Sequence, residues 1–269
     1  MRPRKPLGSP RLATAAATAA CGLALVLGAT SPAAARCPTP AGQFTPDPAF
    51  TSTFLAERCS FATRGVNPFF VLLPGYRIEL ESEEEAATIT VLGETRVVDG
   101  VPTRVVEELS WELDGDERTL VERSLNYFAI CRQTGSVFYF GEDVEFFDEE
   151  GNVIGREGAW LAGRNGARPG IVMPGTVLLG ARYYEEIAPE DSALDKGEVL
   201  AIEEDCGDGR ACVTIRGSND CDDDEDEKTY AEGIGVIADD DLELVRAGFE
   251  GRRPDRVKPP KRRLPRLPR

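Results

Sequence analysis

Apolar and polar residues alternate with a period of two along most of the chain between residues 67 and 250. Alternation of this kind is typical of a half-buried β-strand, with one face on a core and the other toward solvent. Three such segments place the following residues on their apolar faces: Tyr76, Ile78 and Leu80; Val105, Leu109, Trp111 and Leu113; Phe138, Phe140, Val144 and Phe146. The polar residues that oppose the second group, among them Glu108, are expected to face solvent.

Short turn sequences separate the alternating segments. Asp99-Gly100, Asp114-Gly115 and Asp208-Gly209 are dipeptides that readily adopt the positive φ angles of hairpin turns. No segment of this region shows a sustained apolar stripe with the 3.6-residue period of a helix. The pattern therefore predicts an all-β fold, a single antiparallel curved sheet of about ten strands that forms a half-barrel or a barrel.

The β domain of residues 67–250 is flanked by segments of different character. Residues 36–66 have little periodicity and contain Pro46 and Pro48, which predicts an irregular N-terminal arm tied down by disulfides. Residues 251–269 are rich in proline and arginine and poor in apolar residues. Such a tail is expected to be disordered, and its positive charge suits contact with an anionic wall polymer.

Residues 1–35 have the order of a secretory signal peptide: early basic residues, an uncharged apolar run, and small residues that include Ala33 and Ala35. A retained membrane anchor is the alternative. Cleavage would give a secreted or cell-envelope-associated protein with no further transmembrane segment.

Export changes how the cysteines are interpreted. Of seven cysteines, Cys21 lies in the predicted signal, and the even number that remains favours disulfides over free thiols. Cys206 and Cys212 flank a predicted hairpin turn and are expected to pair. A Cys37–Cys59 bridge would tie down the arm, which leaves Cys131 to pair with Cys221.

Composition excludes several classes of function. The formal net charge of −16, with many of the basic residues in the two ends, gives an acidic domain that repels nucleic acid. The chain contains no histidine, so Ser-His-Asp and Cys-His nucleophile systems and histidine-ligated metal sites are excluded. It also lacks a glycine-rich phosphate-binding motif between a strand and a helix.

Carboxylates are the remaining candidates for chemistry. Glu142 and Asp143 follow an aromatic strand and are the best-placed pair for a carboxylate hydrolase, the alternative being a solvated or salt-linked pair. A second cluster resembles the start of a calcium loop but lacks its glycine and its final glutamate. Its candidate calcium ligands are Asp220, Asp222, Asp224 and Asp226. The alternative is that these residues form a solvated acidic loop that binds no cation.

Five motifs occur in order along the chain: Leu73-Pro-Gly-Tyr76, Val91-Leu-Gly-Glu-Thr95, Phe138-Tyr-Phe-Gly-Glu-Asp143, Gly166-Ala-Arg-Pro-Gly-Ile171 with Met173-Pro174, and Tyr230-Ala-Glu-Gly-Ile-Gly235. Together they resemble a family of uncharacterised exported β-rich bacterial proteins, mostly from high-GC organisms. The resemblance covers most of the domain and implies no activity, cofactor or catalytic residue. Cys131 and the cysteine-rich acidic segment 205–228 depart from the family pattern.

These observations favour a non-enzymatic extracytoplasmic protein with a structural or ligand-binding role. The curved sheet is predicted to hold an apolar or envelope-derived ligand against four aromatic residues, Trp111, Phe138, Phe140 and Trp160. The alternative is that these aromatic residues belong to the hydrophobic core. The alternatives are a secreted carboxylate hydrolase, based on Glu142 and Asp143, and a calcium-binding envelope protein. The sequence identifies neither the ligand nor a protein partner.

Overall fold

The computed structural model describes residues 37–115, 117–221 and 225–249, so the predicted signal peptide and basic tail lie outside the described residues. The described chain is all-β, and its helical segments are two short 3-10 turns, η1 (Ala41–Gln43) and η2 (Ala56–Arg58). No helix within these residues is long and apolar enough to cross a membrane. The predicted all-β fold is confirmed.

The strands follow one another mostly through short turns, as the turn sequences predict. In chain order they are β1 (Phe61–Ala62), β2 (Gly65–Asn67), β3 (Phe70–Leu72), β4 (Tyr76–Glu81), β5 (Glu85–Val98), β6 (Val101–Asp114), β7 (Glu117–Cys131), β8 (Val137–Phe147), β9 (Val153–Gly155), β10 (Trp160–Leu161), β11 (Arg168–Met173), β12 (Arg182–Tyr184), β13 (Glu186–Ile187), β14 (Asp195–Glu203), β15 (Cys212–Asn219), β16 (Glu225–Ala231), β17 (Gly235–Asp239) and β18 (Leu242–Phe249).

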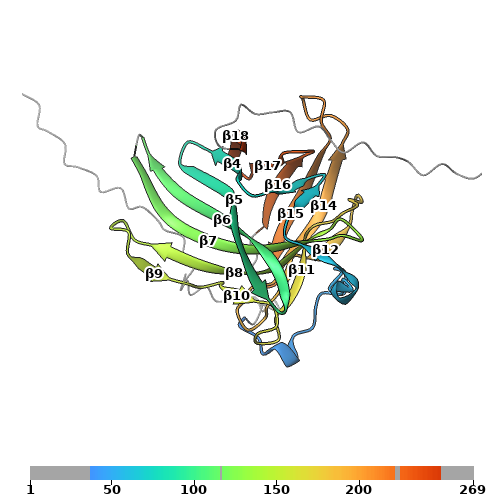
Figure 1. Ribbon diagram of the computed structural model, residues 1–269. Helices are drawn as coiled ribbons and strands as arrows, with labels where there is room; N and C mark the ends of the chain where they lie inside the picture. Colours follow the sequence, from blue (N-terminus) through green and yellow to red (C-terminus); the bar gives the residue numbers. More distant parts are fainter. Residues whose placement is uncertain (1–36, 116, 222–224, 250–269) are drawn as a thin grey trace, which may run out of the picture. The chain divides into compact units, whose positions relative to one another are not determined.

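A single antiparallel sheet contains all of these strands except the β2–β3 hairpin, and it curves into a nearly closed barrel. Its main path runs β12-β14-β15-β16-β17-β18-β4-β5-β6-β7-β8-β11-β13. Figure 1 shows the long strands β5 to β8 on one side and β14 to β16 on the other. The two ends of the path, β12 and β13, are separated in the chain only by Glu185. One short segment of chain therefore supplies both edges of the sheet.

The arm lies against the barrel, and its aromatic side chains form apolar packing on the outer surface of the sheet. Phe44 and Phe50 pack edge-on against the buried ring of Tyr184. Further along the arm, Phe54 makes an edge contact with Phe138. The arm is therefore irregular in its backbone, as predicted, but it is held by aromatic packing as well as by disulfides.

The apolar stripe predicted on β8 is divided by a β-bulge. The register of β8 against β7 shifts between the Phe128–Tyr139 and Asn126–Glu142 pairs, where β8 has an extra residue at Gly141. Gly141 has a φ of 130°, and a Cβ atom there would lie 2.3 Å from the carbonyl oxygen of Trp160. Side chains before and after the bulge therefore alternate out of phase.

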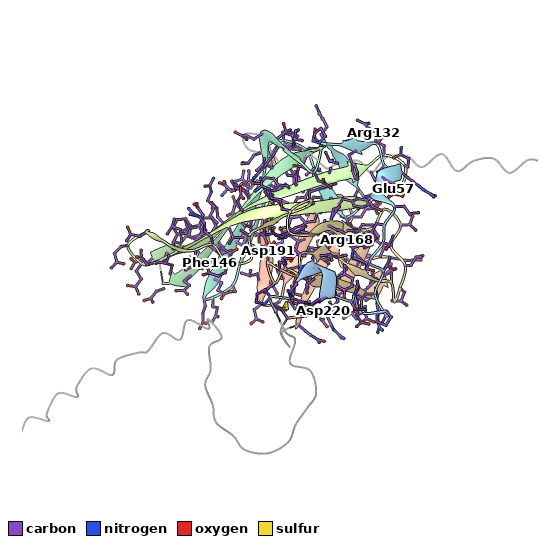
Figure 2. The ribbon with its side chains drawn as sticks, turned by 90° about the horizontal axis from the view of Figure 1, so that it is seen from below. Glu57, Arg132, Phe146, Arg168, Asp191 and Asp220 are labelled. Carbon is purple, nitrogen blue, oxygen red and sulfur yellow. A yellow bond between two sulfur atoms is a disulfide. The ribbon has the colours of Figure 1, made fainter. Side chains whose placement is uncertain are left out.

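The predicted common face of Phe138, Phe140, Val144 and Phe146 is therefore wrong. Phe138 and Phe140 face the outer surface of the sheet, where Phe61 packs edge-on against both rings. Val144 pairs with Ser124 and shares the inner face with it. Figure 2 shows Phe146 on the part of the sheet away from Glu57 and Arg132.

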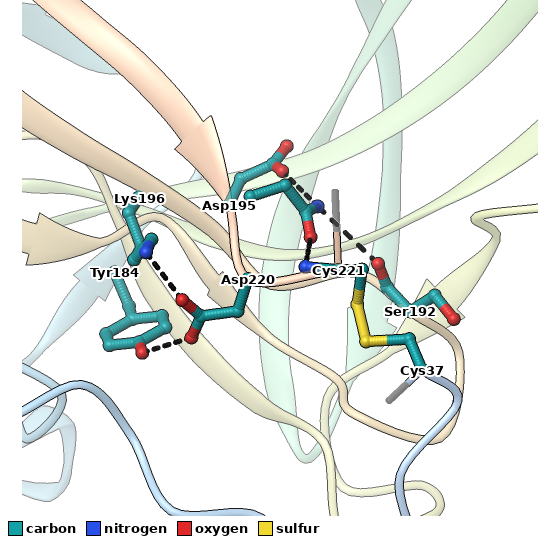
Figure 3. The surroundings of a disulfide bond; sticks show 8 residues. Cys37, Tyr184, Ser192, Asp195, Lys196, Asp220 and Cys221 are labelled. Carbon is teal, nitrogen blue, oxygen red and sulfur yellow. Dashed lines mark hydrogen bonds and ion pairs between the residues drawn. A yellow bond between two sulfur atoms is a disulfide. The ribbon is translucent and has the colours of Figure 1, made fainter. Parts of the chain in front are cut away.

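The disulfides are Cys37–Cys221, Cys59–Cys131 and Cys206–Cys212, with Cα–Cα distances of 5.4, 5.1 and 5.9 Å. The predicted Cys206–Cys212 bridge is confirmed, whereas the predicted Cys37–Cys59 and Cys131–Cys221 bridges are wrong. The arm does not fold back on itself. Phe61 in β1 pairs with Cys131 in β7, which brings Cys59 to Cys131. Cys37 instead lies beside Cys221 in the Tyr184 cluster (Figure 3).

We expect the bridges to differ in their contribution to the free energy of unfolding. The Cys59–Cys131 bridge spans 72 residues and Cys206–Cys212 spans 6. Loop entropy predicts ~4 kcal/mol for the first and ~2 kcal/mol for the second. Urea denaturation of the double variants Cys59→Ala/Cys131→Ala and Cys206→Ala/Cys212→Ala should show the larger loss in the first. Equal losses would contradict this ordering.

Candidate ligand-binding cavity

The interior of the barrel contains a cavity of about 380 Å³. Side chains from strands on all sides of the sheet converge on it, together with the β2–β3 hairpin. Its apolar and aromatic lining consists of Phe70, Val71, Tyr76, Ile78, Ile89, Val91, Val106, Phe128, Tyr139, Val172, Tyr230 and Val236. Its charged lining consists of Glu108, Glu122, Glu142, Glu185, Glu186, Asp195, Asp239 and Lys228. The volume lies within the range of small-molecule sites.

The lining changes from apolar to acidic along the strands. The inward residues of β7, which all line the cavity, run from Phe128 through Asn126 and Ser124 to Glu122. The register places Val106 opposite Asn126 and Glu108 opposite Ser124. Along β6 the lining therefore changes from apolar Val106 to acidic Glu108 in the same direction as it does along β7.

The same change from an apolar to a charged lining appears on the other side of the barrel. Tyr230 pairs with Val236, and Lys228 pairs with Asp239. Both pairs line the cavity, with the charged pair further along the strands. The cavity therefore has an apolar end and a charged end.

Glu142 enters the cavity because of the bulge at Gly141. Burial, together with the negative charges of Glu122, Asp195 and Glu108, raises the pKa of its carboxyl to about 8. A hydrogen bond with Tyr139 opposes this rise. The Tyr139 hydroxyl donates its proton to Asn126 Oδ1 at 2.5 Å, so the phenol is held in place beside Glu142.

Glu186 is the most deeply buried carboxyl of the cavity, with 4% of its surface exposed. Burial raises its pKa well above the usual range, as do the charges of Asp195 and Glu142. The indole N–H of Trp160 interacts with this carboxyl and lowers the pKa. The geometry does not reach that of a hydrogen bond, and Glu186 Oε2 and Trp160 Nε1 have no hydrogen-bond partner within the described chain.

Two further carboxyls have the same electrostatic environment. Burial raises the pKa of Glu108 to about 7 and that of Glu185 to about 8, although the positive charge of the nearby Lys228 opposes the rise in both. Lys228 forms ion pairs with Asp226 at 2.8 Å and Asp239 at 3.4 Å. At neutral pH the cavity thus holds carboxyls that are close to their own midpoints of titration.

The aromatic residues predicted to bind a ligand do not line the cavity. Phe138 and Phe140 lie beneath the arm on the outer face, for the reason given above. Trp111 alternates with the inward-facing Glu108 of β6 and packs beneath the Arg118 guanidinium, 6.0 Å from the ring centre. Trp160 lies behind the cavity wall, in edge contact with Tyr139.

Glu142 and Asp143 do not form the predicted catalytic pair. They are adjacent in β8 and project to opposite faces of the sheet. Asp143 lies on the outer face, where its Oδ2 accepts hydrogen bonds from Arg96 Nη1 at 2.5 Å and from the Tyr127 hydroxyl at 2.6 Å. Glu142 is therefore a cavity residue, whereas Asp143 belongs to a salt-linked cluster outside the barrel.

The candidate calcium ligands are divided in a similar way. Asp220 accepts hydrogen bonds from the Tyr184 hydroxyl and the Lys196 ammonium, both at 2.5 Å (Figure 3). Asp226 is paired with Lys228, and Asp222 and Asp224 lie outside the described residues. Among the residues that the structure describes, no group of three His, Cys, Asp or Glu side chains is arranged to hold a metal ion.

The sequence pattern did not reveal most of the cavity carboxyls. On β6 the predicted alternation is present, but Glu108 points into the barrel and Trp111 points out of it. A signal was present in Tyr183-Tyr184-Glu185-Glu186-Ile187, where two acids interrupt a run of large apolar residues. Acids in such a run are expected either to pair or to line a cavity.

No family model, no curated protein and no solved structure matches this chain. The resemblance to exported bacterial proteins therefore stays a prediction.

Replacing Asp143 by Asn should weaken the outer cluster without affecting the cavity. The change removes the charge that faces Arg96, and we expect the free energy of unfolding to fall by about 1 kcal/mol, since the pair is partly exposed. Urea denaturation measures this. Glu112→Gln, an amide substitution at an exposed carboxyl, is the control; an equal effect in both variants would contradict the assignment.

The cavity carboxyls should make the protein less stable as the pH rises. Their pKa values are higher in the folded protein than in the unfolded chain, so the folded state must release protons between pH 5.5 and pH 8.5 that the unfolded chain has already lost. We expect a loss on the order of 1–2 kcal/mol per carboxyl, allowing for water in the cavity.

Denaturation at these two pH values tests this expectation. Glu142→Gln should reduce the difference in stability, whereas Glu112→Gln should leave it unchanged. A wild-type protein that becomes more stable with rising pH would contradict the assignment.

Proposed function

We propose that this protein is an extracytoplasmic binding protein that holds a small ligand inside its barrel. The observation that carries the proposal is the 380 Å³ cavity, with its apolar end and its carboxyl-rich end. An interior that served only to stabilise the fold would be filled with apolar side chains at the density of an ordinary protein core. This interior instead has open volume bordered by ionisable groups, which is costly for stability.

The three disulfides and the predicted signal support a location outside the cytoplasm. The ligand site differs from the one that the sequence suggested, because Phe138 and Phe140 belong to the packing beneath the arm. The proposed site is instead formed by inward residues of the barrel strands, above all those of β6, β7 and β8. Contact of the basic tail with a wall polymer remains a separate prediction.

A cavity-filling substitution tests the proposal. Ser124 lines the cavity, whereas Leu125, the next residue of β7, projects to the outer face with its register partner Asp143. Ser124→Phe should place a ring in the cavity and weaken ligand binding by about tenfold or more, and Leu125→Phe should leave binding nearly unchanged. Circular dichroism and thermal melting establish that both variants fold.

The probes are amines, alcohols and carboxylic acids built on the same naphthyl, phenyl and octyl groups, measured by calorimetry at pH 8.5. We expect one-to-one binding by at least one series. The proposal is refuted if no probe binds the wild-type protein, or if the two variants bind equally well.

A further inference from the structure

The charges that line the cavity are not balanced. Among the described residues that line it, seven are carboxylic acids and Lys228 is the one basic residue. The Lys228 ammonium is already paired with Asp226 and Asp239. Within the described chain no ion pair includes any of five cavity carboxyls, namely Glu108, Glu122, Glu142, Glu185 and Glu186. Several carboxylates in a confined space require either protons or a bound cation.

One of these carboxyls also has unused hydrogen-bonding capacity. Glu186 is buried and lines the cavity, and its Oε2 atom accepts no hydrogen bond from the described residues. A buried acceptor without a donor costs about 1–3 kcal/mol. Such an atom is expected where a bound molecule supplies the donor. An ammonium or guanidinium group would supply both the N–H donor and the missing positive charge.

The opposite end of the cavity requires a different chemical group. Phe70 and Phe128 are in edge contact, with ring centres 5.3 Å apart. Both rings line the cavity, together with Val106 and Val236. These residues offer no charge to a ligand, and they suit an alkyl or aryl group. The two ends together suit an amphipathic molecule.

An organic cation fits these residues better than a metal ion does. A hard cation such as calcium requires several oxygen ligands converging at short distance. The described residues contain no such group of three acidic side chains. Carboxyls spread around a larger volume suit the dispersed charge of an organic ammonium.

We infer, on the basis of the proposed function, that the ligand is a small organic cation with an apolar body. Its cationic group lies among Glu108, Glu142 and Glu186, and its alkyl or aryl body lies against Phe70 and Phe128. The carboxyls supply both charge neutralisation and hydrogen-bond acceptors. The apolar end selects against small inorganic cations.

This arrangement makes affinity depend on pH. The ionisable groups that face the cationic end are Glu108 of β6, Glu122 of β7, Tyr139 and Glu142 of β8, Glu185, Glu186 of β13, Asp195 of β14, Lys228 and Tyr230 of β16 and Asp239 of β17. The pKa values of Glu108, Glu142 and Glu185 lie at about 7 to 8. Raising the pH from 5.5 to 8.5 ionises these carboxyls and should strengthen the binding of a cation.

The test compares 1-naphthylmethylamine with 1-naphthylmethanol and 1-naphthylacetate, which share a body and differ in charge. At pH 8.5 we expect calorimetry to give an affinity for the amine about tenfold or more above that for the alcohol, with the acetate weakest. At pH 5.5 the preference for the amine should largely disappear. Glu142→Gln and Glu186→Gln should each lower the affinity for the amine by about tenfold and leave that for the alcohol within about twofold.

Asp143→Asn is the matched control, because it removes a negative charge one residue from Glu142 on the outer face. It should leave the affinity for the amine within about twofold. The inference is overturned if the alcohol or the acetate binds as tightly as the amine, or if Asp143→Asn acts like Glu142→Gln. Either result, with binding still blocked by Ser124→Phe, leaves the proposed function standing. Absence of binding by every probe refutes both.

Discussion

Closure of the sheet by one short segment is the constraint on which the rest of the structure depends. β12 and β13 are the two edges of the main sheet, and only Glu185 separates them in the chain. The sheet can therefore close only if β11 comes close to this segment. Gly170 of β11 permits it, since a Cβ atom there would lie 2.4 Å from the carbonyl oxygens of Tyr184 and Glu185. Closure creates an interior, and the segment that closes it places Glu185 and Glu186 on the wall of that interior.

The same closure explains where the stabilising packing lies. A barrel whose centre holds ionisable groups and open volume cannot obtain all of its stability from that centre. Much of the aromatic packing is instead on the outer surface of the sheet, where Phe61 contacts Phe138 and Phe140. The Cys37–Cys221 and Cys59–Cys131 bridges hold the arm over this surface. The arm thus provides the barrel with a second apolar layer outside the sheet, which leaves the interior free for polar groups.

The sequence predicts the fold class because period-two alternation and turn chemistry are local properties of the chain. What it did not predict depends on long-range geometry. The face on which a strand packs depends on the side that the sheet curves toward, and β6 accordingly directs Glu108 inward and Trp111 outward. The phase change on β8 depends on the close approach of Trp160 to Gly141. Cysteine pairing within the arm depends on β1 joining β7, which no local spacing reveals. The Cys206–Cys212 bridge is predictable from the sequence because a local turn brings the two cysteines together.

The differences between the predicted and the observed strand faces share one physical origin, which also bears on function. A strand in a solid sandwich has one dry face, so alternation identifies the core directly. A strand in a barrel covered on the outside has two buried faces, and polarity no longer distinguishes core from solvent. Glu142 illustrates the point: it is polar and yet lies deeper in the molecule than its neighbour Asp143, which is held by Arg96 on the outside. In such a barrel, the polar face of a long strand is where a binding site should be sought, since it borders a volume that apolar side chains have left open.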